Sequence, residues 1–131
     1  MHRTPINPWP WSLPLGYHQA ELLTGITRQL ICAGQTAVDA TGAPQHPGDM
    51  RAQLGLALDN LESVLHAAGM GLADIIRLTV YATDVDAALR NFDLLGQRIG
   101  ALGVAPPMTV VGVTRLAIPP LLVELEATAA A

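Results

Sequence analysis

The sequence predicts a single α+β domain in which two helices pack on one face of a mixed β-sheet. Segments of alternating apolar and polar residues occur near both ends of the chain, and two long helical stripes lie between them. Half of the 131 residues are hydrophobic and only 14% are charged, which supplies a large core. The same composition leaves apolar surface to cover, and this favours an oligomer.

The first third of the chain predicts a proline-rich arm followed by two strands. Residues 1–16 contain four prolines and are predicted to be an arm outside the domain, which spans 17–131. Strands are predicted over 17–24 and 29–37. The four residues between them suit a turn, so we expect these strands to pair as a hairpin.

A first helix is predicted to begin after Asp49, which is a favourable N-cap residue, and to end at Gly69. Its apolar residues recur every three or four positions and form one stripe: Leu54, Leu58, Leu61, Leu65 and Ala68. A half-buried strand follows over 76–82.

A second helix is predicted from Asp84 to Gly103, with one apolar stripe along its whole length. Two strands follow over 108–113 and 121–127, so the predicted order is β-β-α-β-α-β-β. No helix remains to cover the other face of the sheet. A second copy of the same sheet is the natural cover for that face.

Composition excludes several classes of function. The net charge of −4 and the scattered arginines speak against nucleic-acid binding, and there is no lysine for a Schiff base or a P-loop. The four histidines and single cysteine show no metal-ligand spacing, so we expect neither metal nor cofactor. No leader or membrane-spanning segment is recognisable, and a cytoplasmic location is expected.

An ordered series of short strings resembles the Rid (YjgF-like) family of reactive intermediate deaminases. The series runs Ile31–Gln35, Gly48–Asp49, Gln53, Leu58–Leu61, Ala67–Gly69, Val80–Asp84, Asn91, Pro107, Thr109–Leu116 and Val123–Ala127. The resemblance implies a chorismate-mutase-like fold and a barrel-shaped homotrimer, with small-molecule pockets in clefts between subunits. It also implies hydrolysis of reactive imines or enamines to keto acids and ammonia.

The resemblance also implies a site. Glu124 matches the glutamate that positions the attacking water, and Tyr17 matches a tyrosine that orients the ligand. The ligand-binding positions are Ala33, Gly34, Gln35, Asn91, Met108, Thr109 and Val110. By periodicity alone, Glu124 is equally a solvated strand carboxylate that shares a face with Leu122 and Glu126.

Met108 departs from the family pattern, because deaminating members have an arginine there that clamps the substrate carboxylate. Such a contact contributes about 1.5–3 kcal/mol, so its loss weakens binding of a small anion about 10- to 150-fold. Methionine offers a flexible apolar wall instead, or simply fills a gap in the core. The amino acid-derived substrate 2-aminoacrylate is therefore not expected.

Three functions follow as hypotheses. The first is hydrolysis or tautomerisation of an imine or enamine without a clamped carboxylate, and the second is non-catalytic binding of a small ligand by the same trimer. The third, RNA cleavage, is disfavoured by the acidic charge. His18 suits either a general base at the pocket rim or a surface histidine. Trp9 and Trp11 suit capping an apolar ligand, binding a proline-recognition domain, or packing the arm against its own or a neighbouring subunit. The sequence names neither substrate nor pathway.

Overall fold

The centre of the molecule is a five-stranded mixed sheet, seen in a computed structural model that describes all residues 1–131. Its strands are β3 (Gln29–Ile31), β4 (Gln35–Thr36), β5 (Ile75–Ala82), β6 (Met108–Gly112) and β7 (Val123–Ala130). The order is β3-β7-β5-β6, and β4 also pairs with β7. Only β5 and β6 are parallel; β7 runs antiparallel to each of its neighbours.

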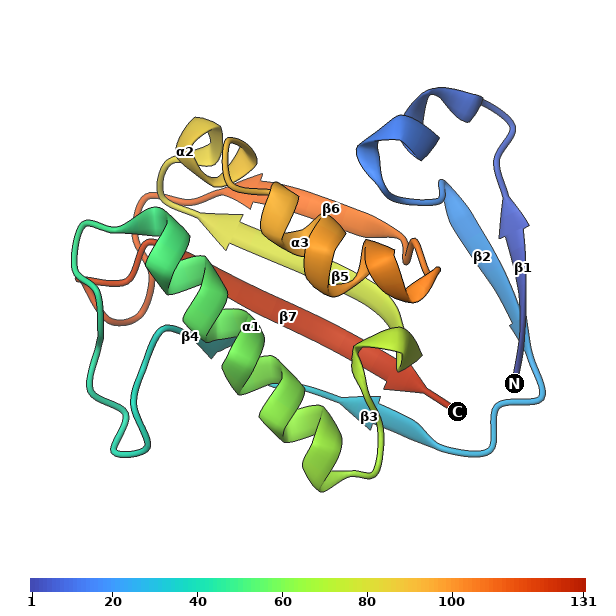
Figure 1. Cartoon of the computed structure of the whole chain (residues 1–131), viewed down its shortest axis with the longest axis horizontal. Helices are drawn as coiled ribbons and strands as arrows, with labels where there is room; N and C mark the ends of the chain where they lie inside the picture. The colour runs from blue at the N-terminus through green and yellow to red at the C-terminus, as the bar shows by residue number, and fades with distance from the viewer.

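The helices lie on one face of this sheet (Figure 1). They are α1 (Met50–Ala67), α2 (Val85–Leu89) and α3 (Asp93–Arg98), with short 3-10 turns η2 (Leu72–Asp74) and η3 (Gly100–Leu102). The four leucines of the predicted stripe are buried, with Leu54, Leu58 and Leu61 inaccessible to solvent, whereas Ala68 follows α1 and is half-buried. The mixed α+β architecture and the placement of the helices are as predicted.

The predicted N-cap residues of both helices are confirmed by their hydrogen bonds. The side chain of Asp49 accepts from the backbone N–H of Ala52, and that of Asp84 accepts from Ala87. Gly69, which follows α1, has a φ of 69°, a left-handed conformation in which glycine is unstrained.

The two faces of the sheet have different characters, because side chains alternate along each strand. Along β7, Val123, Leu125 and Ala127 are buried under the helices. The intervening Glu124 and Glu126 point to the opposite, uncovered face. On β5 the alternation shifts by one residue at a register irregularity between Ile75 and Arg77, so Ile75 is fully buried and the predicted Ile76 is not.

The first 24 residues differ from prediction. The strand β1 (His2–Ile6) pairs antiparallel with β2 (Ala20–Thr24), and the 3-10 turn η1 (Pro10–Leu15) lies between them. The predicted hairpin of β2 with the following strand is wrong, because β3 pairs with β7 instead. β1 was missed because prolines disfavour central strands, whereas Pro5 lies in a two-stranded ribbon whose edges are open.

The β1–β2 ribbon and its 3-10 turn span residues 2–24 and extend beyond the predicted arm of residues 1–16. Residues 2–24 are called the arm below, and they lie beside the sheet (Figure 1). Arg3 ties the arm to the domain: its guanidinium donates to the carbonyls of Ile75 and Ala73, at 2.9 and 2.8 Å. The backbone N–H of His18 donates to the carbonyl of Ala105 at 2.9 Å.

The second predicted helix is broken into α2 and α3. At the break, the backbone N–H groups of Asn91 and Phe92 donate to carbonyls three residues earlier, which tightens the turn. The Asn91 side chain also donates to the carbonyl of Ala87 at 2.8 Å. Gly103, with a φ of 76°, ends the region as predicted. None of the helices combines the length and apolar character needed to cross a membrane.

Candidate functional site

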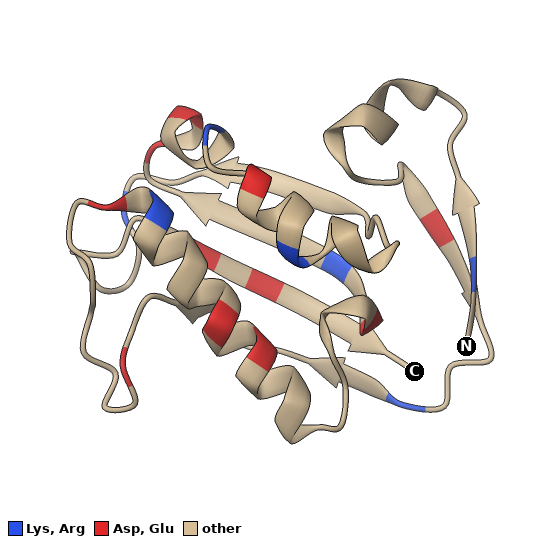
Figure 2. Ribbon diagram, in the orientation of Figure 1, with Lys and Arg blue, Asp and Glu red and all other residues tan.

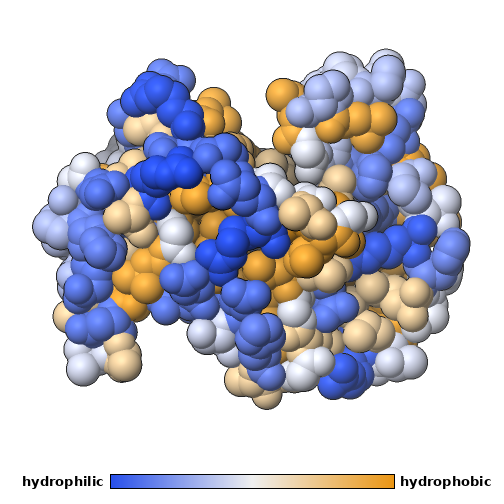
Figure 3. Space-filling view, in the orientation of Figure 1, coloured by the Kyte–Doolittle hydropathy of each residue, from blue (hydrophilic) through white to orange (hydrophobic).

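An apolar groove lies between the arm and the α2–α3 region, over the first residues of β6. Two adjoining cavities of about 450 and 230 Å3 form it, and both are lined by Leu15, Phe92 and Met108. Figure 3 shows hydrophobic side chains on both sides of the notch that separates the arm from α2. No residue that lines either cavity carries a charge.

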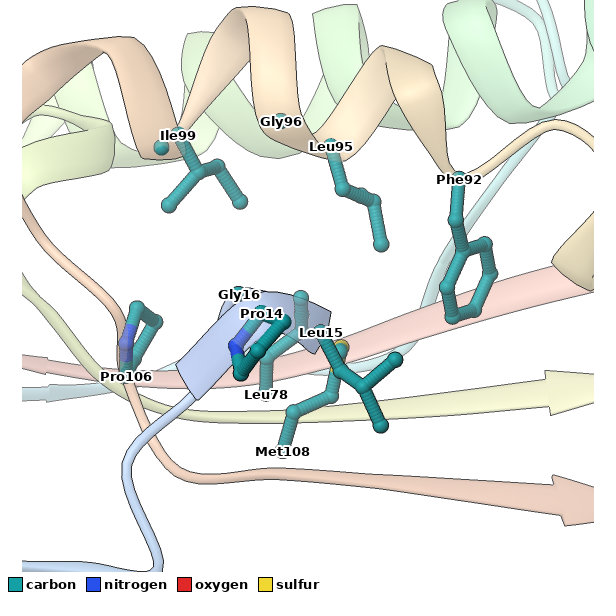
Figure 4. Close-up of a pocket in the computed structure, with 11 residues that line it drawn as sticks. Pro14, Leu15, Gly16, Leu78, Phe92, Leu95, Gly96, Ile99, Pro106 and Met108 are labelled. Carbon is teal, nitrogen blue, oxygen red and sulfur yellow. The ribbon is translucent and has the colours of Figure 1, made fainter. Parts of the chain in front are cut away.

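Each wall of the groove comes from a different element. Met108 pairs in parallel register with Leu78 and so faces the helices, where it also packs against the main core. Figure 4 shows Phe92, Leu95 and Ile99 pointing from the α3 region towards these two strands. The two readings of Met108, as a pocket wall and as a core filler, are therefore compatible.

The arm supplies the remaining wall. Gly16 ends η1 with a φ of 87°, and its N–H donates to the carbonyl of Leu13, so the chain turns back towards the domain. Tyr17 follows and lines the larger cavity together with Leu15 and Leu89. The ring of Trp11 lies edge-on to that of Tyr17, with 6.2 Å between ring centroids.

A second group of predicted residues meets on the uncovered face of the sheet. Glu124 is half-buried on β7, where it pairs with Thr36 of β4 and Tyr81 of β5. A Cβ atom on Gly34 would lie 2.6 Å from the Glu124 carboxyl carbon and 2.9 Å from its Cγ. Gly34 thus leaves open the space that the carboxylate occupies.

Two backbone donors belong to Gly34 and to the residue before it. The N–H groups of Ala33 and Gly34, in the segment between β3 and β4, donate to no carbonyl or side chain of the protein. The amide of Gln35 folds back onto the carbonyl of Ala33 at 3.1 Å. The Glu124 carboxylate therefore lies against a backbone segment whose N–H groups are free to donate. A carboxylate can activate water, and free N–H groups can stabilise developing negative charge.

Tyr81 borders this group. Its hydroxyl donates to the Glu126 carboxylate at 3.2 Å. Desolvation raises the pKa of the Tyr81 phenol, and the negative charge of Glu126 raises it further, with a smaller contribution from Glu124. The phenol is therefore neutral through the physiological pH range and acts as a hydrogen-bond donor.

The chain does not bring all predicted site residues together. Tyr17, Met108 and Val110 line the groove on the helix side, whereas Gly34 and Glu124 meet on the other face, two strands away. Thr109 also lies on that other face, next to the guanidinium of Arg77. Asn91 lines neither cavity, because its amide contacts Ala87 and Arg51 at the surface.

Sequence reasoning missed the role of Gln53. Its side chain is fully buried and donates to the carbonyls of Pro120 and His46, at 3.0 and 3.2 Å. It also accepts from the backbone N–H of Leu122 at 2.8 Å, two residues before Glu124. Gln53 thus anchors the segment that leads into β7. A polar residue directly before Leu54 in the apolar stripe was the available signal.

Comparisons with known proteins agree with this architecture. The family model described as "Endoribonuclease L-PSP" matches residues 16–131. A solved Rid family protein of Yersinia pestis, YyfB, is 34% identical with a TM-score of 0.85, and the match covers all of both chains. A RutC family protein of Pyrococcus horikoshii is 30% identical over 116 residues, 88% of each chain.

One relative has a named reaction. The 2-iminobutanoate/2-iminopropanoate deaminase of Escherichia coli is 36% identical over 58 residues, which is 44% of each chain. The family therefore includes enzymes that act on imines. With a family match over nearly the whole domain and full-length structural similarity to a Rid protein, this chain is a member of the Endoribonuclease L-PSP, or Rid (YjgF-like), family.

Proposed function

We propose that this protein hydrolyses a reactive imine or enamine whose carboxylate, if any, is not clamped by the protein. The observation that carries the proposal is the half-buried Glu124 carboxylate, seated in the space left by Gly34 beside two unengaged N–H donors. Water adds to the C=N carbon, the C–N bond of the resulting carbinolamine breaks, and ammonia leaves with the carbonyl product. An enamine substrate first gains a proton at carbon and loses one from nitrogen, and so becomes the imine.

Each residue has a distinct part in this reaction. Glu124 removes a proton from water as it attacks and returns a proton to the departing nitrogen. The N–H groups of Ala33 and Gly34 donate to the oxygen that develops on the carbinolamine. Tyr17 and Met108 hold the rest of the substrate in the groove, where Met108 provides no positive charge.

The proposed site lies between two copies of the chain in a homotrimer. Within one chain, the groove and the Glu124 group are on opposite faces of the sheet, so one small molecule cannot reach both. The uncovered face, which bears Glu124, is the surface that a neighbouring copy would cover. The groove of one copy and the carboxylate of the next would then border the same ligand.

RNA cleavage is not favoured for this member of the family. Arginine is the only strongly basic residue type, and three of the seven arginines pair with acidic side chains: Arg3 with Glu21, Arg51 with Asp93, and Arg98 with Asp59 and Glu62. Basic residues are scattered over the elements in Figure 2 and form no stripe that could follow a phosphate backbone.

Glutamate-to-glutamine substitution tests the chemistry. Imines are generated in situ by an amine oxidase, and ammonia release is followed with and without the protein. We expect Glu124→Gln to abolish the acceleration, because the amide cannot accept a proton, while Glu126→Gln on the same face retains it. Unchanged turnover by Glu124→Gln would refute the proposal and favour the alternative of a non-catalytic ligand-binding trimer.

Complementation tests the shared site. Glu124→Gln is co-refolded with Leu15→Asp, which places a charge in the groove, and each variant alone is expected to be inactive. Hybrid trimers contain sites whose two halves are both unaltered, so activity returns. A protein that is monomeric by light scattering, or hybrids without activity, would contradict a site built from two copies.

A further inference from the structure

The groove is built to hold one kind of chemical group. Pro14 and Leu15 line it from the arm, Phe92 and Leu95 from the helix side, and Met108 from the strand side (Figure 4). The only polar side-chain atom among the lining residues is the hydroxyl of Tyr17. An ionised group placed here would lose its hydration without gaining a partner.

Cations near the groove do not change this conclusion. Arg51 and Arg98, which lie on the neighbouring helices, are paired with Asp93 and with Asp59 and Glu62. Arg90 follows Leu89 but is exposed and lines neither cavity. Charge complementarity therefore favours an uncharged occupant.

The size and the side chains favour an aromatic ring. A cavity of about 150 Å3 lined by aliphatic and aromatic residues accommodates benzene, and the smaller of the two cavities here measures about 230 Å3. Phe92 and Tyr17 offer ring edges and faces, and a methionine sulfur makes favourable contacts with ring edges. A substrate with only a methyl or ethyl substituent would leave most of this space empty.

We infer that the groove binds the uncharged aromatic substituent of the substrate, and that Leu15 of the arm is a specificity-determining residue for that ring. The inference rests on the proposed function for the identity of the reacting C=N group. The arm wall is well placed for such a role, because Leu15 and Trp11 are 63% and 58% exposed. A ring in the groove would cover Leu15 and lie against Tyr17, on which Trp11 packs.

Binding of three small probes to the intact protein tests the inference by calorimetry. Phenylacetamide has a ring and no charge, phenylacetate has the ring and a negative charge, and acetamide has neither. We expect phenylacetamide to bind at least tenfold more tightly than either of the others. Equal affinity for acetamide would show that the ring is not recognised, and equal affinity for phenylacetate would show that charge is not excluded.

A matched pair of variants tests the arm. Leu13 and Leu15 lie on the same 3-10 turn and are both exposed, at 45% and 63%, but only Leu15 lines the groove. Leu15→Asn should weaken phenylacetamide binding at least fivefold, and Leu13→Asn should leave it unchanged. Equal effects of the two variants would overturn the role of Leu15. Met108→Arg should reverse the preference in favour of phenylacetate, and an unchanged preference would also contradict the inference.

Failure of the inference is distinguishable from failure of the proposed function, because probe binding requires no turnover. Hydrolysis is compared for the imines of benzaldehyde and acetaldehyde, each formed in situ from the corresponding amine. Faster hydrolysis of the benzaldehyde imine supports both claims. If neither imine is hydrolysed while phenylacetamide still binds selectively, the proposed reaction is wrong and the assignment of the groove stands. Equal acceleration of both imines overturns the assignment and leaves the reaction intact.

Discussion

Substitution of Gly34 by alanine should move the Glu124 carboxylate without removing its charge. The new Cβ would lie 2.6 Å from the carboxyl carbon of Glu124, whereas non-bonded carbons approach no closer than about 3.5 Å without repulsion. The carboxylate must therefore move by about 1 Å. A displacement of that size from a reacting group costs about 100-fold in rate, equivalent to about 2.7 kcal/mol of transition-state stabilisation.

Stability should change little in the same variant. Gly34 does not have a left-handed backbone and lies between two strands, so alanine adopts its conformation without strain. Loss of glycine's freedom in the unfolded chain stabilises by about 0.4–1 kcal/mol at such positions. Gly55→Ala is the control: it is the same substitution in α1, where the added Cβ meets nothing within 4 Å.

The assay is ammonia release from an imine, combined with urea unfolding of each variant. We expect Gly34→Ala to lose about 100-fold in turnover at unchanged stability, and Gly55→Ala to retain full activity. Full activity of Gly34→Ala would refute the reasoning, because the carboxylate would then work from another position.

Two further predictions concern neighbours of the site. Gln53→Leu leaves the Pro120 and His46 carbonyls and the Leu122 N–H without their partner. It should therefore lower the free energy of unfolding, measured in urea, by about 2–4 kcal/mol. A free energy of unfolding within about 0.5 kcal/mol of wild type would exclude the anchoring role. The pKa of the Tyr81 phenol is higher in the folded protein than in the unfolded chain, where it is about 10. The stability that this phenol contributes is therefore fully present below a pH of about 10 and is lost as pH rises through its pKa in the folded protein. Ultraviolet titration should show this phenol ionising later in wild type than in Glu126→Gln, and identical titrations would contradict the assigned cause.

Much of the domain could be predicted because local signals and tertiary packing agree there. Asp49 caps α1 as its sequence position indicates, and the alternation along β7 separates Glu124 from the buried Val123 and Leu125. Elements that depend on long-range contacts could not be predicted. Pairing of β3 with β7 joins segments about 100 residues apart, and no local pattern distinguishes it from a hairpin with β2.

The break between α2 and α3 illustrates a second limit. The apolar stripe runs unbroken through it, because a single tightened turn at Asn91 and Phe92 hardly changes the helical period. The break nevertheless decides how Phe92 meets the groove. The groove itself was also unpredictable, since the arm that forms one wall is distant in sequence from α3 and β6, which form the others. Of the predicted site residues, only those on one strand could be placed relative to one another beforehand.

The two halves of the proposed site are built on different elements. This bears on Met108, which stands where the family resemblance implies an arginine. The groove depends on the arm, on α3 and on Met108, whereas the Glu124 carboxylate depends on Gly34 and on the Gln53 anchor. Within a chain these groups share no contacts, so a change at Met108 leaves the geometry around Glu124 intact. Replacement of the arginine by methionine therefore argues for a different substrate and carries no weight against hydrolysis.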